Sequence, residues 1–277
     1  MLKVSPVDVE GIYNSYLEVE NEKNRENRYK GNESWYHASG AGSCSRKLYY
    51  ESVLKAEPTN DLKLRNRRVL RLGTIVHNDF DKAFNLYNKQ VNKQVNKQVN
   101  KQVNKQVNTT IKNKEKNNKK EIKDLKFHVE EEITIDELNV RGFYDLVAED
   151  GREADNPIYL YDLKTTAAYS WKLKFGKTSP FQNQGIFYEL QIGTYGYAVK
   201  EKFGRLDGMY LYYYKKDDSV MKCVSVPLTY VSRAYLFWKN INDEHKQGLP
   251  DFREGVSPVQ KWQCNYCQFL DLCKPPR

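Results

Sequence analysis

Two spacings of apolar residues divide the chain into helices and strands. Helical spacing, with glycine stop signals at Gly204 and Gly248, predicts helices within residues 4–24, 38–55, 64–87, 182–204 and 229–248. Runs rich in β-branched and aromatic residues predict strands at 127–135, 138–149, 157–166, 208–216 and 221–228. The first two strands are predicted to form a hairpin, with Asp136-Glu137 at the turn. This order of elements indicates an α/β fold, in which helices flank a mixed sheet.

The segment between the third helix and the first strand breaks this pattern. The tetrapeptide Asn-Lys-Gln-Val occurs in five copies from residue 88, and a Lys/Asn-rich stretch follows it. A valine at every fourth position drifts around a helix by about 40° per repeat, because a turn holds about 3.6 residues. Low hydrophobicity and high charge predict disorder or a marginal helix. We interpret 88–126 as an inserted solvated spacer, with a lysine-rich DNA tether as the alternative.

The formal charge of +9 comes from this insertion. The chain has 45 Lys and Arg against 36 Asp and Glu, and 88–126 holds 12 lysines against three acidic residues. The rest of the chain is therefore neutral. Net charge therefore does not indicate nucleic-acid binding by the folded part of the chain, and sequence motifs are needed to indicate it.

The sequence also indicates a cellular location. The N-terminal residues lack the apolar core of a secretory signal, and no stretch approaches about 18 apolar residues. We therefore expect a cytoplasmic protein without a membrane span. Five cysteines in such a reducing compartment are expected to bind metal or stay free rather than form disulfides.

A carboxylate and a lysine alternate on the predicted strand 157–166. Asp162 and Lys164 share one face there, because side chains of a strand point to alternate sides. Such a pair can hold a divalent metal and position the water that attacks a phosphodiester. Asp145 lies in an apolar run of the preceding strand, where it can join Asp162 on one ion, and oxygen ligands favour Mg²⁺ or Mn²⁺. The alternative is an ordinary Lys–Asp pair on an exposed strand.

Two predicted helices present further groups at a spacing of four residues. Gly73 and His77 share a face, where the small residue lets the helix approach the sheet and the imidazole suits Mn²⁺. Gln191 and Tyr195 offer an amide and a phenol that can orient the lysine, the water or a phosphate oxygen. A core histidine and a tyrosine at the boundary of an amphipathic helix are the structural alternatives.

Taken in order, four motifs resemble the RecB-like branch of the PD-(D/E)xK nucleases. The motifs are Gly73-x3-His77, Gly142-x2-Asp145, Asp162-x-Lys164 and Gln191-x3-Tyr195. The resemblance implies a restriction-endonuclease-like core and metal-dependent hydrolysis of DNA. It implies metal ligation by His77, Asp145, Asp162 and the Leu163 carbonyl, catalysis by Lys164, and support of the site by Gln191 and Tyr195. The second acid is often glutamate in the superfamily, so the shorter Asp162 puts the metal preference in doubt.

The cysteines extend this resemblance. Cys44 precedes the predicted core, and Cys264, Cys267 and Cys273 follow it as C-x2-C-x5-C. The arrangement is similar to that of the iron–sulfur exonucleases of this branch, which include the CRISPR-associated exonuclease family and phage relatives. It implies a 4Fe-4S cluster that joins the two ends of the chain. A Zn²⁺ site satisfies the same cysteine count. Cys223 is expected to be a buried small hydrophobic residue.

These features predict an organisation and a function. We expect an N-terminal helical region over 1–63, a nuclease core over 64–248 and a C-terminal cysteine segment over 249–277. The expected function is a metal-dependent exonuclease acting on single-stranded DNA or duplex ends, with Arg46 and Lys47 contacting the DNA backbone. The resemblance further implies a CRISPR integrase or recombination proteins as partners. The alternative function is a non-catalytic iron–sulfur or zinc subunit that binds DNA.

Overall fold

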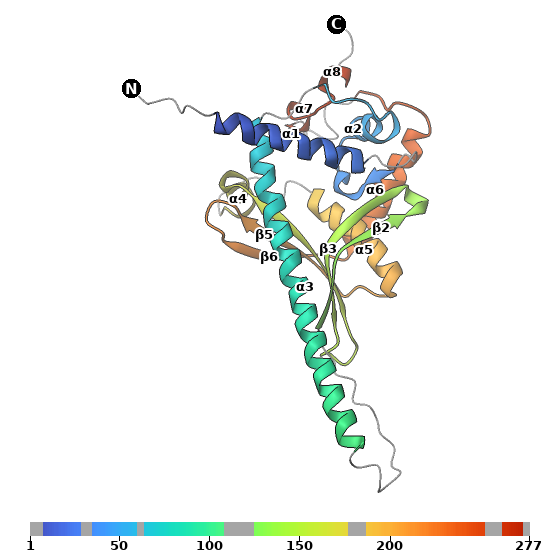
Figure 1. Ribbon diagram of the computed structural model, residues 1–277. Coiled ribbons are helices and arrows are strands. Elements are labelled where there is room, and N and C mark those ends of the chain that lie inside the picture. Colours follow the sequence, from blue (N-terminus) through green and yellow to red (C-terminus); the bar gives the residue numbers. More distant parts are fainter. Residues whose placement is uncertain are drawn as a thin grey trace.

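A mixed sheet of six strands forms the centre of the computed structural model, which describes residues 8–28, 35–59, 64–107, 125–176, 187–252 and 262–273 (Figure 1). The strands are β1 (Tyr36–His37), β2 (Leu125–Ile135), β3 (Val140–Asp150), β4 (Ile158–Thr166), β5 (Gly208–Lys215) and β6 (Met221–Val226). β2 pairs antiparallel with β3, β3 with β4, and β5 with β6, whereas β4 and β5 are parallel. The five predicted strands are confirmed to within two residues at each end. The two-residue strand β1, which pairs parallel with β3, is too short to leave a sequence pattern.

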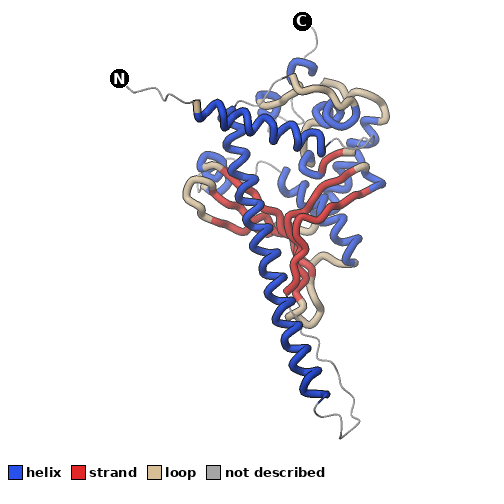
Figure 2. Tube along the Cα trace, viewed as in Figure 1, coloured by secondary structure: helices blue, strands red, loops and turns tan. Residues whose placement is uncertain are grey.

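The sheet opens into a fork between β3 and β4. The two strands pair only along the later part of β3, and Leu146 opposite Tyr161 is the last pair before the fork. Beyond it β4 continues beside β5 and diverges from β3 (Figure 2). Asp145 and Asp162 are the first residues past this last pair, one on each branch. Both predicted metal-binding acids therefore lie where the strands separate.

Helices cover the two faces of the sheet. The long helix α3 (Leu64–Val107) crosses one face, and α5 (Phe187–Phe203) and α6 (Thr229–His245) pack together on the other (Figure 1). The buried indole of Trp238 on α6 donates a hydrogen bond to Thr194 Oγ1 on α5 at 2.8 Å. Gly193 permits this close contact, because a Cβ there would lie 2.3 Å from the Tyr230 carbonyl oxygen. The predicted mixed sheet flanked by helices is confirmed.

Helix α3 is longer than the sequence predicts. The expected helix over 64–87 continues through the repeat to Val107, where disorder or a marginal helix was expected. The Asn88 side chain marks the boundary, because its amide donates to the Phe127 carbonyl at 2.7 Å and accepts from the Phe127 N–H at 3.1 Å. The repeat thus begins where α3 leaves the sheet, and Figure 1 shows the helix running on past it. The remainder of the insertion, up to residue 124, lies outside the described residues.

Smaller elements surround this core. The predicted N-terminal helix is α1 (Val9–Arg28), and residues 4–7 lie outside the described part of the chain. The helix expected within 38–55 is divided into a 3-10 turn η1 (Ala38–Gly40), α2 (Ser45–Leu48) and a π-helical turn η2 (Tyr49–Val53). Three short helices were not predicted: α4 (Ala168–Phe175), α7 (Trp262–Asn265) and α8 (Leu270–Cys273). In the described parts of the chain, no helix is both long and apolar enough to cross a lipid bilayer. The division into three regions stays a prediction, and so does the helix start at 182–186, which lies outside the described residues.

Candidate active site

Asp145 links the two branches of the fork. Its Oδ2 accepts a hydrogen bond of 2.5 Å from the backbone N–H of Leu163 on β4. This bond spans the gap where the regular strand pairing has ended, so the carboxylate is held in a fixed orientation. The backbone of Leu163 lies at the site as predicted, and ligation through its carbonyl stays a prediction.

Asp162 and Lys164 form an ion pair, with Lys164 Nζ 2.6 Å from Asp162 Oδ2. Asp162 is only 1% exposed. Burial raises the pKa of the Asp162 carboxyl, the Lys164 charge opposes this rise, and the Asp145 charge adds to it. Burial lowers the pKa of Lys164, but the charges of Asp162 and Asp145 outweigh this effect and raise it overall. Lys164 is therefore a buried cation, suited to donating hydrogen bonds rather than accepting a proton.

Helix α5 orients this lysine. Lys164 Nζ donates to Gln191 Oε1 at 3.0 Å, and Gln191 Nε2 donates to the Tyr195 hydroxyl at 3.0 Å. The ring of Tyr188 lies 5.1 Å from the same ammonium, within cation–π range. Burial is the largest of the effects that raise the pKa of Tyr195, so its phenol stays protonated. Gly142 leaves room for this phenol, because a Cβ there would lie 3.1 Å from Tyr195 Cε1.

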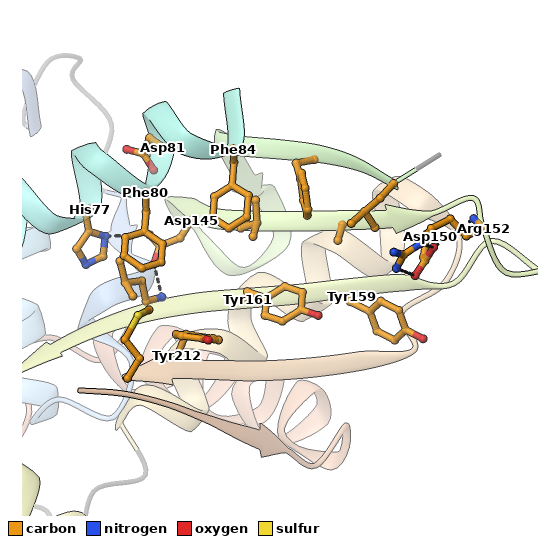
Figure 3. Close-up of a pocket in the computed structure, with 16 residues that line it drawn as sticks. His77, Phe80, Asp81, Phe84, Asp145, Asp150, Arg152, Tyr159, Tyr161 and Tyr212 are labelled. Carbon is orange, nitrogen blue, oxygen red and sulfur yellow. Dashed lines mark hydrogen bonds and ion pairs between the residues drawn. The ribbon is translucent and has the colours of Figure 1, made fainter. Parts of the chain in front are cut away.

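Three groups from three different elements meet on the α3 side of the fork. His77 Nδ1 lies 3.6 Å from Asp145 Oδ1 (Figure 3), and one ligand atom each of His77, Glu130 and Asp145 lies within 4.8 Å of the others. Asp162 is not part of this mutually close set. The structure thus brings together two of the three predicted side-chain ligands and adds Glu130. Sequence reasoning missed Glu130, because it opens a run of three glutamates on β2 and no local pattern distinguishes it.

Negative charge accumulates around these groups. Much of the Glu130 residue is exposed, but its carboxylate is partly buried. This burial raises the pKa of the Glu130 carboxyl, and the charges of Asp145 and Asp81 add to the rise. Burial also raises the pKa of Asp81, which lies one helical turn after His77, and Asp145 contributes. Burial lowers the pKa of His77, but its hydrogen bond to Asp145 and the Asp145 charge raise it overall. One imidazole and several carboxylates around a shared point are a donor set that fits Mn²⁺ or Mg²⁺.

Gly73 sets the distance between α3 and β4. A Cβ at Gly73 would lie 2.7 Å from Thr165 Oγ1, which agrees with the expectation that a small residue brings the helix close to the sheet. We expect Gly73→Ala to lower the free energy of unfolding by about 1–3 kcal/mol, the usual effect of overpacking. Urea unfolding followed by circular dichroism measures this change.

The sign of that effect tests the packing. In a helix interior free of contacts, alanine is more favourable than glycine by about 0.8–1.0 kcal/mol. Adding Thr165→Ala to Gly73→Ala removes the opposing oxygen and should recover most of the lost stability. A Gly73→Ala protein that is more stable than the wild type would contradict the close approach of α3 to β4.

A cavity of about 340 Å³ extends from His77 and Asp145 between α3 and the sheet (Figure 3). An ion pair of 2.6 Å between Arg152 and Asp150 lies at its far end. Most of the lining is apolar, and the aromatic residues in it are Phe80, Phe84, Phe127, Tyr159, Tyr161 and Tyr212. The sequence analysis did not single these residues out, although Tyr159 and Tyr161 follow the alternation of one strand face. The candidate metal ligands His77 and Asp145 therefore open onto an aromatic surface.

The four predicted cluster cysteines gather from both ends of the described chain. Cys44 precedes α2, Cys264 lies on α7, Cys267 follows α7, and Cys273 ends α8, all four as free thiols. Burial raises the pKa of the Cys267 and Cys273 thiols, and a charge on Cys44 raises both further. Ligation of a metal centre by these four cysteines, either iron–sulfur or zinc, stays a prediction.

Direct contacts hold the C-terminal segment against the region around Cys44. The Tyr50 hydroxyl donates to the Leu272 carbonyl at 3.1 Å, and the Thr59 N–H donates to the Gln268 carbonyl at 2.9 Å. The Tyr50 ring also stacks on Phe269, with ring centroids 5.8 Å apart. The C-terminal segment is therefore packed against the part of the chain that follows Cys44.

The remaining predicted residues have mixed outcomes. Arg46 donates to the Pro250 carbonyl at 2.5 Å and to the Tyr50 hydroxyl at 3.0 Å, so its guanidinium has partners within the chain. The charge of Lys47 lowers the pKa of the Cys267 thiol, against the larger effect of burial. Contact of either residue with DNA stays a prediction. The expected burial of Cys223 is wrong, because β6 is an edge strand and the residue is exposed there.

The chain is similar to one protein family and to solved structures over most of its length. The model of the PD-(D/E)XK nuclease superfamily matches residues 34–274. Among solved structures, the crystal structure of SSO0001 is 15% identical with a TM-score of 0.48, and the alignment covers 95% of this chain and 97% of that one. A candidate exonuclease from Eubacterium rectale is 15% identical with a TM-score of 0.45, covering 91% and 94%. No curated protein matches at a significant level.

Proposed function

Because the chain belongs to the PD-(D/E)XK nuclease superfamily, we propose that it is a metal-dependent DNA exonuclease that hydrolyses phosphodiester bonds in single-stranded DNA or at duplex ends. One observation carries the proposal. At the fork, Asp145 is fixed by the Leu163 N–H, and the buried Asp162–Lys164 pair is held by Gln191. This combines metal-binding carboxylates with an oriented cation, the two elements that phosphodiester hydrolysis needs.

Each group has a separate part in the reaction. His77, Asp145 and Asp162 would hold Mg²⁺ or Mn²⁺. The ion would act as a Lewis acid that polarises the scissile phosphate and lowers the pKa of the attacking water. An ammonium has three N–H donors, and two of those of Lys164 face Asp162 and Gln191. We assign the third to the attacking water or to a phosphate oxygen, where it stabilises developing negative charge. Gln191 keeps the lysine in this orientation.

The aromatic cavity supports a preference for single strands. It begins at His77 and Asp145, so a nucleotide at the metal places its neighbour along the lining. Unpaired bases stack on aromatic side chains, with about 1–3 kcal/mol per base, whereas bases within a duplex are already stacked on each other. An unpaired strand or a frayed end is therefore the substrate that this surface favours.

The cysteines complete the proposal. We assign to Cys44, Cys264, Cys267 and Cys273 a 4Fe-4S cluster with a structural role, with Zn²⁺ as the alternative occupant. The docking of Leu272 and Gln268 onto the region around Cys44 supports that role, because ligation there would lock the two chain ends together.

A nuclease assay tests the function. We expect the full chain to release nucleotides from end-labelled linear single-stranded DNA with Mn²⁺ or Mg²⁺, and to lose this activity in excess EDTA. Covalently closed circular single strands should resist cleavage, because an exonuclease needs an end. Denaturing gels of both substrates give the two rates. Equal cleavage of circles and linear strands would overturn the exonuclease assignment, and intact DNA under all metals, equally with wild type and Asp162→Ala, would overturn the nuclease.

A further inference from the structure

Glu130 has an unusual backbone conformation in the middle of β2. Its φ angle is 51°, in the left-handed region that non-glycine residues seldom adopt within a strand. β2 nevertheless keeps one register with β3 on both sides, with Val129 opposite Leu146 and Glu131 opposite Tyr144. No residue is inserted, and Glu130 faces Asp145 between these two pairs. The strand is thus distorted at the one position that faces the metal-binding aspartate, and such strain is retained where its surroundings enforce it.

The position of Glu130 suits a shared cation. Ligand atoms of His77, Glu130 and Asp145 come from α3, β2 and β3 and lie within 4.8 Å of one another. Ligands about 2.1 Å from an octahedral ion are roughly 3.0 Å apart when adjacent and 4.2 Å apart when opposite. Small side-chain movements would therefore close these three groups around one ion.

Two of the other carboxylate oxygens nearby already have partners. Asp145 Oδ2 accepts the Leu163 N–H, which leaves Oδ1, the oxygen near His77, to bind metal. Asp162 Oδ2 is fully buried and pairs with the Lys164 ammonium, but it accepts no well-formed hydrogen bond within the described part of the chain. This buried oxygen indicates that the site is built to hold a positive charge. A further carboxylate on the open side of the site would complete the ligand set.

We propose that Glu130 is a ligand of the catalytic divalent ion, binding it together with His77 and Asp145. The proposal rests on the metal-dependent function proposed above, and it adds a ligand that the family motifs in the sequence did not indicate. A site with two carboxylates and an imidazole on its open side favours Mn²⁺, which accepts nitrogen more readily than Mg²⁺ does.

Mn²⁺ binding to the DNA-free full chain tests the proposal without relying on activity. Electron paramagnetic resonance of free Mn²⁺ gives the dissociation constant. Glu130→Gln should weaken binding by about tenfold or more, comparable with the larger effects seen when groups around a metal are removed. Glu132→Gln is the matched control, because it removes the same charge from an exposed residue of the same strand. It should change the affinity by less than about twofold, since exposed charges are screened.

A second variant separates ligation from folding. Glycine adopts positive φ without strain, so Glu130→Gly should melt no lower than the metal-free wild type while binding Mn²⁺ as weakly as Glu130→Gln. Wild-type affinity in either Glu130 variant overturns the proposal. If Asp145→Asn then still abolishes Mn²⁺ binding, the proposed nuclease site stands without Glu130. If Asp145→Asn also binds Mn²⁺ like the wild type, or the wild type binds none, the metal-dependent function fails together with the proposal.

Discussion

Lys164→Met should slow DNA hydrolysis by at least about 100-fold while leaving Mn²⁺ affinity nearly unchanged. The loss follows from removing a preorganised donor to developing charge, which typically lowers catalytic rates by about 10²–10³-fold. Metal binding is spared because the ammonium pairs with Asp162 and Gln191 and is not itself a ligand. Single-turnover rates at saturating Mn²⁺, together with the Mn²⁺ dissociation constant, measure the two effects separately.

Controls distinguish loss of chemistry from loss of structure. Lys164→Met leaves Asp162 buried without its cation, which destabilises the fold, whereas Asp162→Asn with Lys164→Met replaces both charges and should recover much of that stability. The double variant should remain inactive. Lys239→Met removes an exposed lysine from the α6 surface pair with Asp243 and should leave the rate within about twofold of wild type. A rate for Lys164→Met within tenfold of wild type would contradict the role assigned to this lysine.

Cys44→Ser should remove the bound iron and lower the melting temperature by about 10 °C or more. Cys44 is the proposed ligand farthest in sequence from the other three, so its loss would separate the two ends of the chain that the proposed cluster would join. A loss of about 4 kcal/mol corresponds to about 8–16 °C, because 1 kcal/mol shifts the melting temperature of a domain this size by about 2–4 °C. Elemental analysis of anaerobically purified protein and thermal unfolding give the two readouts.

Cys223→Ser is the matched control for that prediction. Its thiol is exposed on β6, away from the other four cysteines in the fold, so iron content and melting temperature should match those of the wild type. Zinc in place of iron in the wild type would exclude the iron–sulfur cluster and keep the four-thiolate site. Full metal content and an unchanged melting temperature in Cys44→Ser would contradict a centre shared by the two chain ends.

The sequence predicts those features that depend on local periodicity. Alternation along 157–166 correctly places Asp162 and Lys164 on one face of β4, and the spacing of four residues places Tyr195 beside Gln191, which itself contacts the lysine. These relations are set by the geometry of a single strand or helix. The contact between them needs only that α5 packs on that face of the sheet.

Features that depend on the path of the whole chain were missed. Glu130 reaches the metal-binding groups through its strand register with Asp145 and a positive φ angle, and neither can be read from three consecutive glutamates. The exposure of Cys223 depends on β6 being an edge strand, which is a property of strand order rather than of composition. The aromatic cavity likewise needs α3 and five strands, β2 to β6, to be placed relative to one another before its lining can be identified.

Because α3 continues through the repeat, the number of repeat units sets how far this helix extends beyond the sheet. The helix that carries His77 is hydrogen-bonded to β2 through Asn88 and extends beyond it as a helical arm to Val107. Each tetrapeptide unit lengthens this arm by about 6 Å and turns its tip by about 40°. Replication slippage in the repeat would therefore change the length of the arm and the rotation of its end about the helix axis in fixed steps. Because every such step lies beyond Asn88, the length of the arm can vary while His77 stays beside Asp145.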